Sequence, residues 1–249
     1  MNSTSNLNPK AKLFITSLPC DFDLSSTNYP TFYKQNHFLE NLKNFWKSQS
    51  KILYITASPD ENNDGVIEFL KECVKSSHLT YSEFDLCDSK NCDQKIELYD
   101  VIFLGGGHVP TQKKFFDKIN LKSKISKFEG IIIGVSAGSM NSAKTVYAQP
   151  ELPGEAIDPN YIRFFDGLNL TEFMILPHYY ALKDNTLDGL KIFEDITYGD
   201  SVGRKFYILP DGSYILQTTE ECYLYGEAFI VENKKMERLC NNDEKIKLY

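Results

Sequence analysis

The sequence predicts an α/β protein with a doubly wound, mostly parallel sheet flanked by helices and a C-terminal antiparallel β extension. Short apolar runs alternate with amphipathic stretches through the first two thirds of the chain, and after residue 200 the pattern changes to extended runs joined by turns. Neither a Gly/Ser linker nor an internal repeat marks a boundary within the 249 residues. We therefore expect one domain over 1–249, with a parallel-sheet core at 10–200 and a β meander at 205–240.

The expected strands are short and rich in β-branched or aromatic residues, which is typical of a buried parallel sheet. They lie at 12–18, 51–58, 81–86, 100–106 and 130–135. Between them, the stretches at 30–48 and 64–77 place apolar residues at helical spacing. This alternation predicts helices on both faces of the sheet.

The C-terminal segment predicts antiparallel strands. Residues 206–217, FYILPDGSYILQ, are two extended runs around a Pro-Asp-Gly turn, and residues 222–239 continue with further turn residues. We expect this meander either to close one edge of the sheet or to form a small appendage.

The composition argues against several classes of protein. The formal net charge is −7 and no Lys/Arg stripe is interleaved with aromatic residues, so we expect no nucleic-acid partner. No apolar run reaches the ~18 residues of a membrane span, and the polar N-terminal stretch MNSTSNLNPKAK does not resemble a secretory signal. We therefore expect a cytoplasmic protein that binds no membrane.

The six cysteines contain no C-x-x-C pair, which predicts free thiols and no metal site.

A serine lies at the end of the fifth predicted strand. Residues 134–138, Gly-Val-Ser-Ala-Gly, match the G-x-S-x-G nucleophile elbow, with a buried strand in front and a helix-compatible stretch behind. The sharp turn would strain Ser136, and the flanking glycines would let backbone and substrate approach. The N–H of Ala137 would point at an oxyanion near the serine. Because the motif also occurs by chance, a helix-capping serine is the alternative interpretation.

An activated serine needs a base, and His178 is the best placed of the four histidines. It follows the apolar run FMILP at 173–177, so we expect it at the carboxyl end of a strand, where sites of open α/β sheets gather. A histidine satisfied by local hydrogen bonds is the alternative. A third group must orient the imidazole. Chain order does not choose among the acids between Ser136 and His178, which are Glu151, Glu155, Asp158, Asp166 and Glu172.

A glycine-rich turn follows the predicted strand at 100–106. The stretch FLGGGHVPTQ at 103–112 lacks the spacing of a dinucleotide fingerprint and the lysine of a P-loop. The N–H of Gly107 could instead supply the second half of an oxyanion hole. We expect His108 beside it either to contact substrate or to cap the loop.

With these motifs the chain resembles the peptidase E family, the aspartyl dipeptidases, whose clan includes cyanophycinase and whose fold is similar to that of class I glutamine amidotransferases. The motifs that carry the resemblance are DVIFLGGGH at 100–108, GVSAGSMNSA at 134–143, QPELPGEAIDP at 149–159 and ILPHY at 175–179. They span the middle third of the chain. The resemblance implies a serine peptidase that requires no metal or cofactor.

The resemblance also implies the roles of single residues. Ser136 would be the nucleophile and His178 its base, and Gly107 and Ala137 would donate to the oxyanion. Glu151, which stands in Glu-Leu-Pro, would be the acid of a Ser-His-Glu triad.

Two departures from the family pattern fall where substrate would be recognised. His108 stands where dipeptidase members commonly have asparagine, and the segment from Glu151 to His178 is longer and carries Arg163. Arg163 is therefore a weak candidate for pairing with a substrate carboxylate, and a surface salt bridge is its alternative role. Both changes bear on the pocket that would hold an N-terminal aspartate.

We expect a serine peptidase of short peptides, including dipeptides with N-terminal aspartate, that acts as a monomer or homodimer. Hydrolysis of β-aspartyl (cyanophycin-like) peptides is the alternative activity, and a catalytically idle binding module is the alternative from another class. A glutaminase of the amidotransferase type would need cysteine at the elbow, where Ser136 stands.

Overall fold

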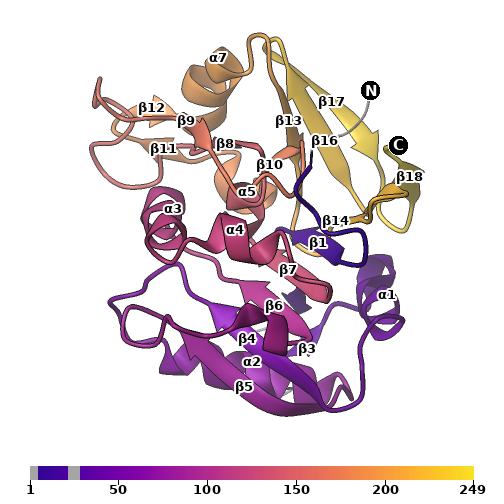
Figure 1. Cartoon of the computed structure of the whole chain (residues 1–249). Coiled ribbons are helices and arrows are strands. Elements are labelled where there is room, and N and C mark those ends of the chain that lie inside the picture. Colours follow the sequence, from indigo (N-terminus) through magenta and orange to yellow (C-terminus); the bar gives the residue numbers. More distant parts are fainter. Residues whose placement is uncertain (1–4, 22–28) are drawn as a thin grey trace.

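The five strands predicted first along the chain form the parallel part of one eight-stranded sheet (Figure 1). The computed structural model describes residues 5–21 and 29–249, so the first four residues of the polar N-terminal stretch lie outside the described residues. Across the sheet the parallel strands are β1 (Lys12–Thr16), β7 (Ile131–Val135), β6 (Val101–Leu104), β4 (Ser50–Ile55) and β5 (Tyr81–Cys87). Beyond β1 lie the antiparallel strands β14 (Tyr214–Gln217), β15 (Cys222–Tyr225) and β18 (Lys245–Lys247). The predicted α/β class with a mostly parallel sheet is confirmed.

Helices cover both faces of this sheet because its parallel strands are apolar on both sides. Along β1, Phe14 packs on one face while Leu13 and Ile15 pack on the other, and all three are fully buried. The helices on the Phe14 face are α1 (Phe38–Lys43) and α2 (Asp64–Ser76). Those on the opposite face are α3 (Val109–Lys118), α4 (Leu121–Ile125) and α5 (Ala137–Asn141).

The helix predicted at 30–48 is shorter than expected. The strand β3 (Thr31–Phe32) and the 3-10 turn η1 (Gln35–His37) precede α1. Asn36 and His37 have φ angles of 54° and 60°, which an α-helix does not allow. The buried side chain of Asn36 donates from Nδ2 to the carbonyl oxygen of Gly212 at 2.9 Å. This contact between distant parts of the chain overrides the local helical pattern.

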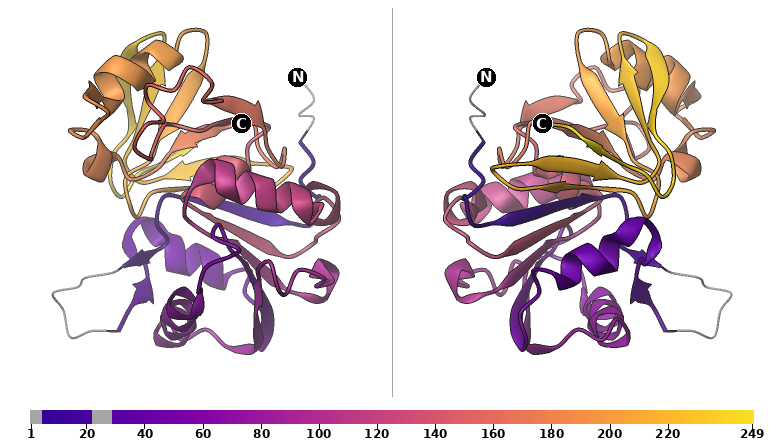
Figure 2. Two further views of the ribbon diagram at one scale, coloured as in Figure 1. Left: turned by 90° about the vertical axis from the view of Figure 1, so that its left-hand side faces the viewer. Right: turned by 90° about the vertical axis from the view of Figure 1, so that its right-hand side faces the viewer.

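The C-terminal strands do not form the single meander predicted at 205–240. A second, four-stranded sheet has the order β10 (Met174–Leu176), β13 (Lys205–Ile208), β16 (Ala228–Glu232) and β17 (Lys235–Cys240), with β10 and β13 parallel. β14 and β15 instead extend the central sheet. The Pro-Asp-Gly turn after β13 therefore carries the chain from one sheet to the other. In Figure 2 the orange-to-yellow part of the chain lies above the indigo strand β1, at the opposite end of the molecule from the purple strands.

Short elements complete the described chain. The two-stranded sheets are β2 (Cys20–Asp21) with β3, β8 (Thr145–Tyr147) with β9 (Phe164–Asp166), and β11 (Thr186–Leu187) with β12 (Leu190–Lys191). The short helices are α6 (Tyr179–Leu182), α7 (Tyr198–Asp200), the 3-10 turn η2 (Ile96–Leu98) and the π-helical turn η3 (Ile192–Thr197).

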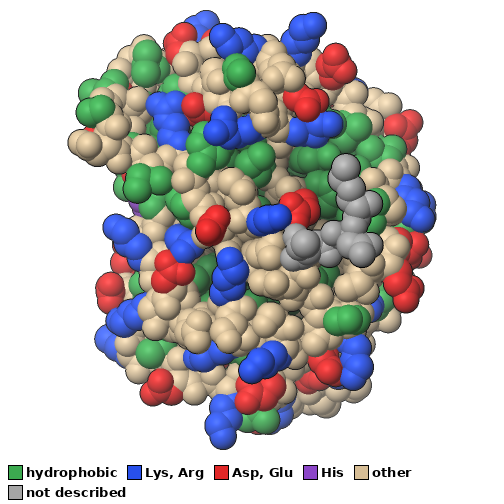
Figure 3. All heavy atoms as spheres, turned by 45° about the horizontal axis from the view of Figure 1, so that its top comes forward, with side chains coloured by type: hydrophobic (Ala, Val, Ile, Leu, Met, Phe, Trp, Pro, Cys, Tyr) green, Lys and Arg blue, Asp and Glu red, His purple; other side chains and the backbone are tan. Residues whose placement is uncertain are grey.

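None of the helices in the described ranges has both the length and the apolar character that crossing a bilayer requires. Acidic and basic side chains are interspersed on the face shown in Figure 3.

The two sheets bring their strand ends together at one place. β1 and β7 are parallel neighbours of the central sheet, and Ser17 and Ser136 follow their carboxyl ends. β10 and β13 are parallel neighbours of the second sheet, and His178 and Asp211 follow theirs. The Ser17 side chain hydrogen-bonds to Asp211 and to the backbone of His178. Functional groups of open α/β folds gather at such strand ends.

Candidate active site

Ser136 lies on the turn between β7 and α5, as the motif predicts. Its φ and ψ are 48° and −110°, a combination that residues other than glycine rarely adopt. Its backbone N–H donates to the carbonyl oxygens of Ser17 at 2.9 Å and Thr16 at 3.2 Å. Ser136 occupies the N-cap position of α5, but its hydroxyl makes no capping hydrogen bond. The neighbouring strand therefore holds the strained turn, and capping does not explain the serine.

The glycines of the motif are required by the packing around this turn. A Cβ atom on Gly134 would lie 2.8 Å from Cα of Ser139, and a Cβ on Gly138 would lie 2.1 Å from the carbonyl oxygen of Leu104. Backbone atoms cannot move aside as a flexible side chain can. The G-x-S-x-G pattern thus reflects close packing of strand and helix and is no chance match.

His178 follows β10 and contacts a carboxylate that was not among the candidates from sequence. Its Nδ1 lies 2.7 Å from Oδ1 of Asp211, which follows β13. Burial alone would raise the pKa of Asp211, but hydrogen bonds from His178 and Ser17, together with the charge of His178, lower it below its usual value. A proton on Nδ1 leaves Nε2 as the basic nitrogen of the imidazole. Asp211 is therefore placed to orient His178.

Glu151 does not contact His178 in the way that the family resemblance implied. None of the five acids predicted as candidates hydrogen-bonds to the imidazole in the described chain. Glu151 instead lines a cavity together with His178. Glu155 contacts His108, and Asp158 accepts a nearby backbone N–H. The acid that contacts His178 therefore follows it in the chain, whereas the family resemblance implied Glu151, which precedes it.

Ser17 joins the nucleophile turn to the His-Asp pair. It is fully buried, its Oγ donates to Oδ1 of Asp211 at 2.5 Å, and the backbone N–H of His178 donates to the same Oγ at 2.8 Å. Its carbonyl oxygen also accepts the N–H of Ser136. One side chain and its backbone therefore fix the relative positions of three groups. No hydrogen bond joins the Ser136 hydroxyl to the imidazole within the described residues, a contact that catalytic sites often form only with substrate bound.

A repeated tripeptide in the sequence could have revealed Asp211. Ile-Leu-Pro precedes His178 at 175–177 and Asp211 at 208–210. The strands that carry it are parallel neighbours, with Leu176 opposite Ile208. When two neighbouring parallel strands end at the same level of the sheet, the residues that follow them lie side by side. No comparable signal marks Ser17, whose position depends on the order of strands in the sheet.

The predicted oxyanion donors lie on two turns beside the nucleophile. Ala137 is the first residue of α5, and Gly107, with φ of 142°, ends the glycine-rich turn after β6. That turn passes close to the serine, since a Cβ on Gly106 would lie 3.5 Å from Cβ of Ser136. Neither Gly107 nor Ala137 has a hydrogen-bond partner for its N–H within the described residues. Their role as oxyanion donors stays a prediction.

His108 anchors residues 150–158, which we call the pocket loop. Its Nδ1 lies 2.8 Å from Oγ1 of Thr111, and its Nε2 lies 2.9 Å from Oε1 of Glu155. The other oxygen of Glu155 accepts the N–H groups of Glu151 and of the next residue at 2.9 and 3.0 Å. These backbone hydrogen bonds and the charge of His108 outweigh the effect of burial and lower the pKa of Glu155. Of the two expected roles for His108, its contacts match that of holding a loop.

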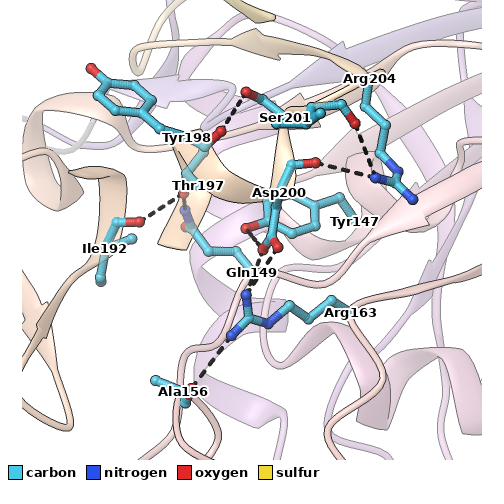
Figure 4. A network of polar contacts seen from close by, with 11 residues as sticks. Tyr147, Gln149, Ala156, Arg163, Ile192, Thr197, Tyr198, Asp200, Ser201 and Arg204 are labelled. Carbon is cyan, nitrogen blue, oxygen red and sulfur yellow. Dashed lines mark hydrogen bonds and ion pairs between the residues drawn. The ribbon is translucent and has the colours of Figure 1, made fainter. Parts of the chain in front are cut away.

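Arg163 is already paired with a carboxylate of its own chain. Its Nη1 lies 3.0 and 2.9 Å from the two carboxylate oxygens of Asp200, which also accepts the hydroxyl of Tyr147 at 2.8 Å (Figure 4). Its side chain is 27% exposed, and Arg163 is not among the residues that line the cavity. The suggested contact of Arg163 with a substrate carboxylate would require breaking this pair.

One cavity of ≈ 340 Å³ lies in front of Ser136 and His178. Its size is at the lower end of the range for small-molecule sites, which suits a short substrate. Its apolar wall comes from Met140, Leu182, Leu187 and Ile192, and Glu151 is the one acidic side chain among the described residues of the lining.

A model of peptidase family S51 matches residues 22–224, which is more than half of the chain. The chain belongs to peptidase family S51. This confirms the resemblance to peptidase E, and membership of the family implies serine peptidase activity.

Two solved structures are similar in fold to this S51 peptidase. A peptidase from an acI-B1 Actinobacterium is 16% identical with a TM-score of 0.61, and the match covers 97% of this chain and 99% of that chain. A candidate peptidase E protein from Listeria monocytogenes EGD-e is 20% identical with a TM-score of 0.52, and the match covers 92% and 99%. At these identities the similarity shows the fold alone. Comparison with the curated proteins gives no match.

The candidate site combines a serine hydroxyl, an imidazole and a carboxylate. In the described ranges no group of three or more His, Cys, Asp or Glu side chains is arranged to hold a metal ion, and the six cysteines are free thiols. The hydroxyl stands on a strained turn at the start of a helix, and the imidazole has its Nδ1 engaged and no partner for Nε2 among the described residues. Such a set can activate a nucleophile and transfer a proton.

Proposed function

We propose that this chain is a serine peptidase that hydrolyses short peptides through Ser136, His178 and Asp211. The observation that carries the proposal is the 2.7 Å contact between Nδ1 of His178 and Oδ1 of Asp211, beside the strained turn of Ser136. In hydrolytic triads an acid binds one nitrogen of the imidazole, and the imidazole acts as the base for a nearby nucleophile. In this proposal Asp211 takes the role that the family resemblance implied for Glu151.

In the first half of the reaction, Nε2 of His178 takes the proton of the Ser136 hydroxyl while Oγ attacks the carbonyl carbon of the peptide bond. The resulting tetrahedral intermediate carries its negative charge on the former carbonyl oxygen. Its collapse breaks the C–N bond, and His178 gives its proton to the leaving amine. Ser136 is left as an ester of the acyl part of the substrate. Asp211 stays ionised throughout and stabilises the imidazolium.

In the second half, water hydrolyses this ester. His178 takes a proton from the water whose oxygen attacks the ester carbonyl, and returns it to Oγ of Ser136 when the acid product leaves. The N–H groups of Gly107 and Ala137 would stabilise the oxyanion in both halves. Their lack of other hydrogen-bond partners in the described chain supports this role.

The resemblance to aspartyl dipeptidases makes dipeptides with N-terminal aspartate the first substrates to test, and β-aspartyl peptides the alternative. The cavity of ≈ 340 Å³ favours substrates of this length. Both kinds would bring an extra carboxylate to a wall whose described residues include no Lys or Arg. Neutral dipeptides therefore belong in the same panel.

The test measures dipeptide hydrolysis and fluorophosphonate labelling for wild type, Ser136→Ala and a surface control, Ser126→Ala. We expect wild type and Ser126→Ala to cleave and to be labelled at Ser136. Ser136→Ala should lose the label and at least ~10³-fold in kcat/KM, because the nucleophile is gone. Absence of both hydrolysis and labelling in wild type would instead support the idle binding module.

A further inference from the structure

The cavity beside Ser136 has an unusual charge balance. Among the described residues that line it, Glu151 is the only one with an Asp, Glu, Lys or Arg side chain. An anionic group of a substrate would find no cation on this wall, whereas a cationic group would find a carboxylate. The basic candidate from sequence, Arg163, is held by both carboxylate oxygens of Asp200.

The carboxylate of Glu151 has no partner within the described part of the chain. No ion pair or hydrogen bond engages its side chain there, whereas Glu155, four residues on, is bound by His108 and by two backbone N–H groups. Glu151 is exposed to solvent at the cavity, and the surrounding protein atoms together with the negative charge of Glu155 raise its pKa to about 7. A bound cation would remove the cost of ionising this group. Glu151 therefore has the properties of a receptor for positive charge.

The backbone that carries Glu151 is fixed before any substrate arrives. Its N–H donates to Oε2 of Glu155 at 2.9 Å, and the far side of the pocket loop is held by Asp188, which accepts the N–H groups of Gly154 and Ala156. A carboxylate on a held loop can bind a ligand without a large ordering cost. The apolar part of the cavity wall offers a place for an uncharged side chain beside it.

We propose that Glu151 is the specificity residue of this pocket and binds the protonated amino terminus of a short peptide whose first residue is apolar. The proposal rests on the serine peptidase function proposed above. With the ammonium at Glu151, the first residue's side chain lies against Met140, Leu187 and Ile192, and Ser136 attacks the first peptide bond. The substrate class is then dipeptides and short peptides with a free amino terminus and no acidic first residue.

The experiment compares wild type with Glu151→Gln on leucylalanine, N-acetyl-leucylalanine, aspartylalanine and Nα-acetyl-lysylalanine. Glu172→Gln, a half-exposed glutamate paired with Lys144, serves as the matched control. We expect wild type to prefer leucylalanine over its acetylated form by at least ~10-fold and over aspartylalanine by a similar factor. Glu151→Gln should lower kcat/KM on leucylalanine by ~10–100-fold, mainly through KM, because a charge-assisted hydrogen bond is lost. Its activity on the acetylated form should change by less than ~3-fold, and Glu172→Gln should behave as wild type.

Several outcomes would overturn this assignment while leaving the peptidase proposal intact. These are an equal loss on the free and acetylated peptides, no loss on either, or a wild-type preference for aspartylalanine. Glu151-dependent cleavage of Nα-acetyl-lysylalanine at the rate of leucylalanine would show that Glu151 binds a side-chain ammonium and not the amino terminus. Fluorophosphonate labelling of Ser136 without cleavage of any of the four would also reject the substrate class. Absence of labelling and of all cleavage would instead reject the peptidase function itself.

Discussion

The nucleophile turn and the pocket loop border the same cavity, but the chain holds them by different means. At the turn, the N–H of Ser136 binds main-chain carbonyls of the β1 end, and Gly138 packs where no Cβ fits. The pocket loop is held by side-chain carboxylates, those of Glu155 and Asp188. The proposed nucleophile therefore depends on the fold itself, while the proposed recognition group depends on contacts that a single substitution can remove.

The largest expected effect is on kcat and comes from removing the charge of the carboxylate that orients His178. Asp211→Asn preserves the shape of the side chain but removes its charge and favours the wrong tautomer of His178, so kcat should fall by ~10³–10⁴-fold. The measurement is kcat on the best dipeptide. Asp117→Asn, on an exposed helix surface, is the control. A loss below tenfold would show that another acid, Glu151 first, orients the imidazole.

The close packing of the nucleophile turn can be tested by adding a Cβ atom where none fits. Gly138→Ala places a Cβ 2.1 Å from a backbone carbonyl oxygen, so the free energy of unfolding should fall by ~1–3 kcal/mol. Gly65→Ala is the matched control, because no atom lies within 4 Å of the added Cβ and the residue is helical. Urea unfolding curves measure both. Equal stability of Gly138→Ala and wild type would contradict the packing argument.

The same contrast explains which features could be predicted from sequence. The parallel strands and the Ser136 turn are local patterns, because alternating apolar runs and a glycine-flanked serine leave few other structures open. His178 was found because a strand directly precedes it. Asp211 lies 33 residues beyond His178, and only the pairing of β10 with β13 brings them together. The helix predicted at 30–48 is shortened to α1 for a similar reason, since Asn36 binds Gly212 in a distant part of the chain.

A smaller effect, on KM, is expected from removing a contact that holds the pocket loop. Asp188→Gly removes the carboxylate that holds Gly154 and Ala156, and glycine tolerates the φ of 53° at this position. KM for a free dipeptide should rise by up to ~10-fold, because the loop must be ordered on binding, while kcat stays within ~2-fold. Asp188→Asn, which keeps an acceptor oxygen, should lie between this variant and wild type. A fall in kcat with unchanged KM would mean that the loop supports catalysis itself.

The smallest effect concerns pH. The pKa of Glu151 is raised from an ordinary value of 4.5 to about 7 in the folded chain, so the folded state binds this proton more tightly than the unfolded state. The resulting stability is fully present below pH 4.5 and is lost as the pH rises through about 7. Because the cavity is open to solvent, we expect Glu151→Gln to gain less than ~1 kcal/mol relative to wild type between pH 5 and 8.

Unfolding free energies of wild type and Glu151→Gln at both ends of this pH range measure that difference. Glu155, Tyr161, His108 and His178 lie around the same loop and cavity, and comparing the two proteins at each pH largely cancels what these groups contribute to stability. A wild type that gains relative stability as the pH rises would mean that a cation of the chain itself pairs with Glu151. The carboxylate would then be a structural contact like Glu155 and Asp188, and the pocket would have no free acceptor for an ammonium.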